Sequence, residues 1–151
     1  QKLRNMELLS EVISQCVQLK ANVVAEDERE GNKRRILNFG HTIGHSLETY
    51  FGFDILRHGE AVAYGMLAAG KLSIKYGKCR KEDLRILNST IDKLPLPKLP
   101  DFDPWDIMKI MKSDKKVKTG NIHFVLLEKI GKATIVDSIK DDEIISAIKS
   151  I

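Results

Sequence analysis

The sequence of 151 residues predicts a mainly α-helical fold, a multi-helix domain with one small β-hairpin. Over most of its length, apolar residues recur at the spacing of an amphipathic helix, and only two short runs near the C-terminus are rich in β-branched residues. The hydrophobic fraction is 42% and the charged fraction is 30%, a balance that can bury one core and that differs from that of a disordered chain. We therefore expect residues 1–151 to form a single domain.

The composition also argues against several classes of protein. No apolar run approaches the roughly 18 residues of a membrane-spanning helix, so we expect no membrane partner. Cys16 and Cys79 lie far apart and outside any C-x-x-C pair, which disfavours a disulfide scaffold and favours a reducing, cytoplasmic compartment. The formal net charge of +4 is too small to indicate nucleic acid, although it suits an anionic ligand.

Local signals predict six helices. Periodicity predicts the first four, at residues 3–24, 35–51, 59–76 and 81–94. The charged stretch at 26–35 contains Gly31 and Asn32 and predicts a loop or a break between the first two helices. Gly77 suits the left-handed cap that ends the third helix.

The remaining elements follow a proline-rich connector at residues 95–100, which cannot be helical because each proline lacks a donor and fixes its own φ. Asp103 and Pro104 supply an N-cap and a first helical residue for a fifth helix, at 104–112. Two β-rich runs, at 122–127 and 133–136, flank a turn and predict a hairpin. An aspartate at position 141 or 142 then caps a last helix that ends near the C-terminus.

A polar stripe is expected on the second helix. Its members, at offsets of 0, 4, 7 and 11 residues, are Arg34, Asn38, His41 and His45. Lys and Glu would suffice for a solvated face, whereas two histidines at i and i+4 can bring their imidazoles to one metal ion or one substrate. An ordinary polar surface explains an isolated His-x-x-x-His pair equally well. Thr42 stands where the H-E-x-x-H motif of zinc proteases carries its glutamate, so that motif is absent.

Glycines in this region indicate a close approach to the backbone. Gly40 and Gly44 each lower helix stability by roughly 1 kcal/mol relative to alanine. Small residues continue in the next helix, and tight helix packing alone would explain them. They are Ala61, Gly65, Ala68, Ala69 and Gly70.

A third histidine, His58, lies at the expected start of the next helix. The preceding loop is short, so an antiparallel helix pair would bring His58 back toward His41 or His45. Three histidines from two adjacent helices favour a metal site, since catalytic zinc usually has three protein ligands and one open position. His123 alternates with buried-type residues in the predicted hairpin and is expected on the strand surface.

Five segments together resemble the C-terminal domain of the 3-dehydroquinate synthase family. They are KANVV (20–24), DEREG (27–31), LNFGHTIGH (37–45), HGEAV (58–62) and DKK (114–116). They occur in the family's order and at similar spacing, and the resemblance covers nearly the whole chain. It implies the C-terminal helical domain of a dehydroquinate synthase-like fold.

The resemblance also implies an activity. Enzymes of this family are lyases that convert 3-deoxy-arabino-heptulosonate 7-phosphate, a phosphorylated sugar acid, into 3-dehydroquinate and phosphate, the second step of the shikimate route to aromatic amino acids. They use a divalent metal, usually zinc and sometimes cobalt, and an NAD that is regenerated in each cycle. Family members are commonly homodimers.

The matching positions imply roles for individual residues. His41 and His58 resemble the histidine metal ligands, and His45 resembles the histidine that assists proton transfer, with Glu30 near it. The positions that resemble substrate-binding residues are Lys20, Arg34, Asn38 and one or both of Lys115 and Lys116. The chemistry agrees, because a metal polarises a hydroxyl, cations pair with phosphate and carboxylate, and neutral imidazole moves protons. Taken singly, each of these residues could equally be a solvated surface group.

Two parts of the family pattern are missing. The family's third metal ligand is a glutamate in a G-x-x-E-V-I-K motif upstream, which Glu11 does not match. The sequence has no G-x-G-x-x-G motif and no P-loop, and in the family NAD is bound by an N-terminal α/β domain. Because the chain also opens with Gln1, we expect it to be part of a longer protein and to be inactive without that domain.

Three alternatives remain open. Another sugar-phosphate cyclase, such as a 2-deoxy-scyllo-inosose synthase, shares the fold and much of the site. A metal-dependent polyol dehydrogenase such as glycerol dehydrogenase is more distant and would accumulate NADH. A helical binding module without chemistry, for instance a nucleic-acid binder, is disfavoured because basic and aromatic residues do not interleave.

Overall fold

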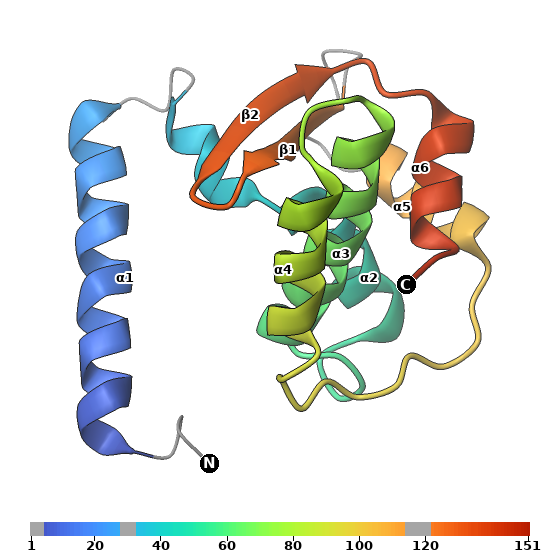
Figure 1. Cartoon of the computed structure of the whole chain (residues 1–151). Coiled ribbons are helices and arrows are strands. Elements are labelled where there is room, and N and C mark those ends of the chain that lie inside the picture. The colour runs from blue at the N-terminus through green and yellow to red at the C-terminus, as the bar shows by residue number, and fades with distance from the viewer. Residues whose placement is uncertain (1–4, 28–32, 114–121) are drawn as a thin grey trace. The chain divides into compact units, whose positions relative to one another are not determined.

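The computed structural model describes residues 5–27, 33–113 and 122–151. The helices are α1 (Met6–Glu26), the 3₁₀ helix η2 (Lys33–Asn38), α2 (His41–Phe51), α3 (His58–Lys75), α4 (Lys81–Ile91), α5 (Pro104–Ser113) and α6 (Asp141–Ile148), and the strands are β1 (His123–Lys129) and β2 (Lys132–Asp137). The mainly helical fold with one hairpin is confirmed (Figure 1). None of the helices in the described ranges is long and apolar enough to cross a membrane.

The chain divides into two compact units, residues 1–37 and 38–151. The first unit contains α1, whose first turn is capped by Asn5, since its side-chain oxygen accepts hydrogen bonds from the backbone N–H groups of Glu7 and Leu8. At the far end of this unit, the backbone N–H of Arg34 donates to the carboxylate of Asp27 at 3.0 Å. This bond connects the residue after α1 to the start of η2.

The expected continuous helix over residues 35–51 is wrong. The 3₁₀ helix η2 ends at Asn38, and α2 begins anew at His41 after Gly40, whose φ of 80° lies in the left-handed region. A residue with this φ ends one helix and starts another, and glycine adopts it without the steric penalty of a Cβ atom. Arg34 and Asn38 therefore do not share a helix with His41 and His45, and the four-residue stripe does not exist as one helical face.

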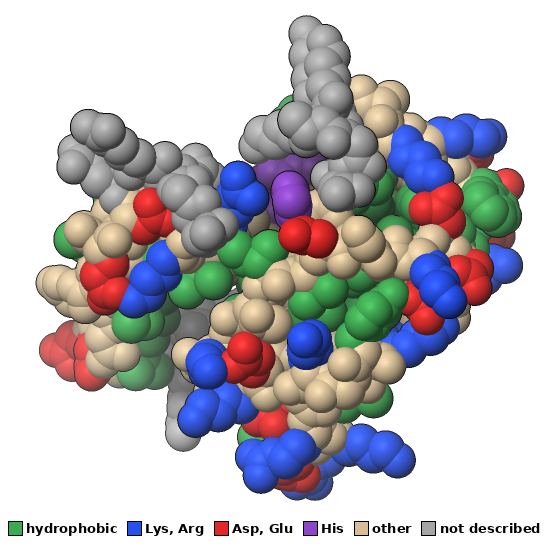
Figure 2. Space-filling model, turned by 90° about the horizontal axis from the view of Figure 1, so that it is seen from above, with side chains coloured by type: hydrophobic (Ala, Val, Ile, Leu, Met, Phe, Trp, Pro, Cys, Tyr) green, Lys and Arg blue, Asp and Glu red, His purple; other side chains and the backbone are tan. Residues whose placement is uncertain are grey.

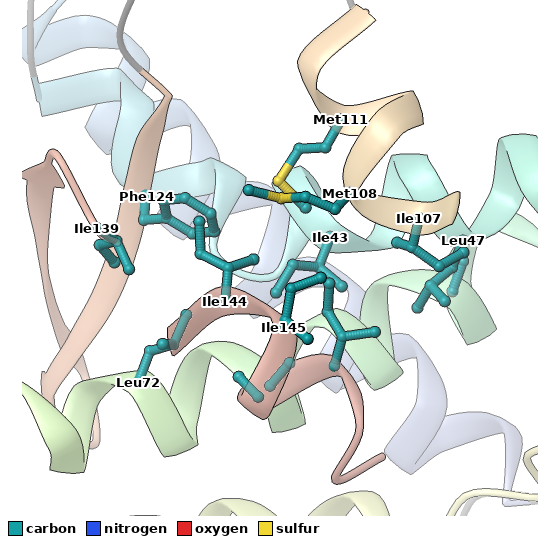
Figure 3. Packing of buried hydrophobic residues seen from close by; sticks show 14 of the residues in the cluster. Ile43, Leu47, Leu72, Ile107, Met108, Met111, Phe124, Ile139, Ile144 and Ile145 are labelled. Atoms are coloured by element: carbon teal, nitrogen blue, oxygen red, sulfur yellow. The ribbon is translucent and has the colours of Figure 1, made fainter. Parts of the chain in front are cut away.

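The core of the second unit lies between its helices and the hairpin. Helix α3 packs against α2, α4, α6 and β1, and α5 packs against α2 and α6 (Figure 1). Buried apolar side chains from five elements meet there (Figure 3). They include Ile43 and Leu47 of α2, Leu72 of α3, Ile107, Met108 and Met111 of α5, Phe124 of β1, and Ile144 and Ile145 of α6. This core holds the start of α2 in place relative to α3.

The hairpin is antiparallel and closes at Gly131, whose φ is 85°. Its strand β1 is buried from Phe124 to Leu127, and β2 pairs with it along one edge. The backbone N–H of Leu127 donates to the hydroxyl of Ser73 in α3 at 2.8 Å. The turn is held as well, because the N–H of Ile130 donates to the carboxylate of Asp83 in α4 at 3.1 Å.

Three glycines allow α2 and α3 to approach closely. A Cβ atom at Gly44 would lie 2.9 Å from the Cα of Val62, and one at Gly65 would lie 2.0 Å from the carbonyl oxygen of Gly40. Real Cβ atoms do not make such contacts with backbone, so a side chain at either position would force the helices apart. The close approach expected at Gly40 and Gly44 is therefore confirmed, and the group that approaches them is α3.

Candidate metal centre

Three histidine rings form a cluster where α2 and α3 both begin. His41 is the first residue of α2, His45 lies one turn further on, and His58 is the first residue of α3. The ring centroids are 5.6 Å apart for His41 and His45, 5.5 Å for His41 and His58, and 5.3 Å for His45 and His58. The expectation that the short loop returns His58 toward the other two is confirmed. Histidine side chains gather in one patch on the face seen in Figure 2.

His41 is the half-buried member of this cluster. Its Nδ1 lies 3.3 Å from the carbonyl oxygen of Phe39, a group that can only accept, so Nδ1 carries the proton and Nε2 carries the lone pair. Burial lowers the pKa of His41 below its ordinary value, and the neighbouring His45 and His58 add to this effect while the Phe39 carbonyl opposes it. The ring is therefore biased toward the neutral form that a metal ligand must have.

His58 is held by a carboxylate. Its Nδ1 lies 2.9 Å from Oε2 of Glu48, a residue of α2 whose side chain is only 11% exposed. The same oxygen lies 3.9 Å from Nδ1 of His45, which is ion-pair distance but too long for a hydrogen bond. Sequence reasoning missed Glu48. Its position, seven residues after His41 and three after His45, was the available signal, because both spacings keep it on the same side of one helix.

These side chains fit a divalent metal ion as part of a donor set. In both His41 and His58, Nδ1 faces an oxygen acceptor and Nε2 has no such partner, an arrangement that metal-bound histidines commonly have. Within residues 5–27, 33–113 and 122–151, no group of three or more His, Cys, Asp or Glu side chains could hold a metal ion. His41 and His58 alone would therefore not complete the three-ligand site of catalytic zinc, which would need at least one further donor.

The remaining predicted site residues fall into two groups. Lys20 is exposed in α1 and Arg34 is half-buried in η2, both within the first unit, whereas Asn38 is an exposed residue of the second unit. The others lie outside the described residues, namely Glu30, Lys115 and Lys116. The roles of all six stay predictions.

His123 does not belong to the cluster. It is an exposed residue of β1, and its Nδ1 contacts the carboxylate of Asp137, its cross-strand partner in β2. The expectation of a strand-surface histidine is confirmed. The backbone of this residue is nevertheless tied to α2, because the hydroxyl of Thr42 donates to the carbonyl of His123 at 3.3 Å.

A comparison with protein-family models identifies the family of this chain. Residues 1–117 match the family described as 3-dehydroquinate synthase C-terminal. The chain belongs to this family. The match covers every segment on which the resemblance rested, from KANVV at 20–24 to DKK at 114–116.

Curated 3-dehydroquinate synthases are similar over most of the chain. The enzyme of Nostoc punctiforme is 44% identical over 138 residues, which are 90% of this chain and 38% of that protein. The enzyme of Dehalococcoides mccartyi (strain BAV1) is 40% identical over 151 residues, which are 99% of this chain and 42% of that protein. The chain therefore spans about two fifths of the length of these relatives.

Solved structures of related cyclases have the same fold. A 2-deoxy-scyllo-inosose synthase complexed with carbaglucose-6-phosphate, NAD+ and Co2+ matches with a TM-score of 0.83 and 26% identity, over 95% of this chain and 41% of that one. ValA, the 2-epi-5-epi-valiolone synthase from Streptomyces hygroscopicus, with NAD+ and Zn2+ bound, matches with a TM-score of 0.81 and 25% identity, over 97% of this chain and 41% of that one.

Proposed function

We propose that this chain is the metal- and substrate-binding domain of a 3-dehydroquinate synthase, a cytoplasmic lyase of the shikimate route. The full protein would convert 3-deoxy-arabino-heptulosonate 7-phosphate into 3-dehydroquinate and phosphate. The observation that carries the proposal is the cluster of His41, His45 and His58 at 5.3–5.6 Å, formed by the segments LNFGHTIGH (37–45) and HGEAV (58–62). Identities of 44% and 40% to curated 3-dehydroquinate synthases support this reaction over others.

His41 and His58 would hold a zinc or cobalt ion through Nε2, because Nδ1 of each ring already faces an oxygen acceptor. Structural relatives bind these two metals, which supports the choice. A divalent ion in this place would supply a Lewis acid for a substrate hydroxyl. A third ligand would come from the N-terminal domain.

His45 would hold and move a proton at the same site. Its ring is 54% exposed and lies 5.6 Å from His41 and 5.3 Å from His58, so a substrate bound at the two ligands would lie within its reach. Imidazole suits this role because its ordinary pKa lies near neutral pH. Glu30 would act beside it.

The cations would bind the charged ends of the substrate. Arg34 offers a planar fork for a carboxylate or phosphate, while Lys20 and one of Lys115 and Lys116 offer point charges, and Asn38 would bind hydroxyls. NAD would be bound mainly by the N-terminal domain, and the full protein would form a homodimer. This chain by itself would then be inactive, since it lacks both the cofactor domain and the third metal ligand.

The test is a zinc titration of this chain with and without the N-terminal domain. We expect weak binding by the two histidines and much tighter binding when the domain completes the site. Equal zinc affinity in the two states would contradict the proposed ligand set. Turnover by this chain alone, near that of the intact protein, would contradict its proposed inactivity.

A second candidate is a 2-deoxy-scyllo-inosose synthase, favoured by the TM-score of 0.83 to such an enzyme. Its lower identity of 26%, against 44% for a 3-dehydroquinate synthase, makes it the weaker choice. The intact protein should be incubated in parallel with 3-deoxy-arabino-heptulosonate 7-phosphate and with glucose 6-phosphate. Phosphate release from the second substrate only would select the inosose synthase.

A further inference from the structure

The side chain of Glu48 is largely buried beside the histidine cluster, although the histidine that it contacts is exposed. Its side chain is 11% exposed, whereas the His58 ring that it contacts is 49% exposed. The pair of His123 and Asp137 in the hairpin is different, because these side chains are 41% and 56% exposed. A largely buried carboxylate loses hydration that a solvated pair would keep, and its hydrogen bond to His58 offsets part of that loss.

We infer that Glu48 is the positioning residue for His58, fixing the ring so that Nε2 is its ligating atom; this inference rests on the metal site of the proposed function. Ionised Glu48 can only accept hydrogen bonds, so at 2.9 Å from Nδ1 it selects the form of the ring in which Nδ1 carries the proton. The lone pair is then on Nε2, and the negative charge makes that nitrogen a better donor to a cation.

The hydrogen bond between Glu48 and His58 links the two helices that carry the proposed metal ligands. Glu48 lies on α2, the helix that also carries His41, whereas His58 begins α3 after the loop at residues 52–57. The hydrogen bond therefore orients the ring of His58, at the start of α3, relative to α2, which carries His41. Backbone packing at Gly44 and Gly65 sets the separation of the helices, and Glu48 sets the rotation and the tautomer of the ring.

The first experiment measures the tautomer without any metal. The chain, labelled with ¹⁵N in its histidines, is studied by two-bond ¹H–¹⁵N correlation NMR at pH 8 as wild type, Glu48→Ala and Glu48→Gln. We expect His58 with the proton on Nδ1 in the wild type and a shift toward the Nε2-protonated form in Glu48→Ala. Glu48→Gln keeps a neutral acceptor of the same size and should give an intermediate result.

The second experiment measures zinc affinity by chelator competition in the intact protein, meaning this chain with its N-terminal domain. We expect Glu48→Ala to weaken binding about 10- to 100-fold and Glu48→Gln to weaken it less. Glu143→Gln is the matched control, since it removes another poorly exposed carboxylate, which pairs with Lys75 and Tyr76 rather than with a histidine. Its zinc affinity should stay within about twofold of wild type.

The outcomes separate the two proposals. Unchanged His58 tautomer and unchanged zinc affinity in a folded Glu48→Ala variant would overturn the role of Glu48 and leave the metal site intact. If Glu48→Ala does not fold, Glu48→Gln decides by the same two measurements. An intact wild-type protein that binds no zinc would instead overturn the proposed function, and with it the role of His58 as a ligand.

Discussion

A Cβ atom on Gly65 would lie 2.0 Å from the carbonyl oxygen of Gly40, far inside any allowed contact. Gly65 belongs to α3, which begins with His58, and Gly40 immediately precedes His41 at the start of α2. Because Gly65 has no side chain at this crossing, the two helices that carry the histidines can approach each other closely.

We expect Gly65→Ala to lower the free energy of unfolding by about 1–3 kcal/mol or more, because the methyl group meets backbone atoms that cannot rotate away. Urea denaturation measures the change. Gly59→Ala in the same helix is the control, since its added Cβ would have no described atom within 4 Å apart from its chain neighbours and the backbone of its own helix. It should leave stability unchanged or raise it by up to about 1 kcal/mol. Equal stability of the two variants would contradict the packing argument.

The pKa of His41 makes the stability of the fold depend on pH. Burial lowers this pKa, so between the folded value and the ordinary value of about 6.5 the unfolded chain binds more protons than the folded one. Stability contributed by neutral His41 is therefore present above about pH 6.5 and is lost as the pH falls through the folded pKa. We expect the NMR titration midpoint of His41 below about 6.5, and a midpoint above this value would refute the sign.

Ser73 joins the hairpin to α3 through a buried hydroxyl. It donates to the carbonyl of Ala69 at 2.6 Å and accepts from the N–H of Leu127 at 2.8 Å, and its side chain is 0% exposed. Ser73→Ala would leave the buried N–H of Leu127 without its acceptor, so we expect a loss of about 1–3 kcal/mol in chemical denaturation. The control is Ser89→Ala, which removes an exposed hydroxyl of α4 and should change stability by less than about 0.5 kcal/mol. A Ser73→Ala variant within that smaller range would argue against the bond's importance.

The histidines should differ in their effect on metal binding. We expect His41→Ala and His58→Ala each to weaken zinc binding by the intact protein at least about tenfold, which is about 1.4 kcal/mol. His123→Ala should leave the affinity unchanged, because the His123 side chain pairs with Asp137 in the hairpin. Isothermal titration calorimetry of the three variants provides the comparison, and a loss in His123→Ala equal to the other two would point to a different ligand set.

The helix break at Gly40 shows where sequence reasoning failed. Polar residues at offsets of 0, 4, 7 and 11 have the spacing of one helical face. Periodicity alone cannot reveal a break between two helices when this spacing continues across the break. Gly40 indicated a close approach, but glycine adopts either sign of φ, so neither its left-handed φ nor its contact with α3 can be read from the local sequence. The prediction still holds for the two histidines, because His41 and His45 both lie within α2.

Glu48 was missed for a related reason. A glutamate in the middle of a helix is usually a solvated surface residue, and the spacing from His41 and His45 indicates only that it lies on their side of the helix. Its 11% exposure and its contact with His58 arise only when α3 is placed beside α2. By contrast, the hairpin, the proline connector and the start of α5 were all predicted, because each depends on residues within a few positions of one another.

The sequence by itself determined the mainly helical class, the hairpin and the histidines that come together, because periodicity, proline and glycine preferences and family motifs are local in the chain. Only the tertiary structure decided that α2 starts after Gly40, that Gly44 and Gly65 serve helix packing, and that Glu48 holds His58. These features depend on which backbone and side-chain atoms meet across two helices, and the free energy of such contacts is set by their distance in space rather than by their separation in sequence.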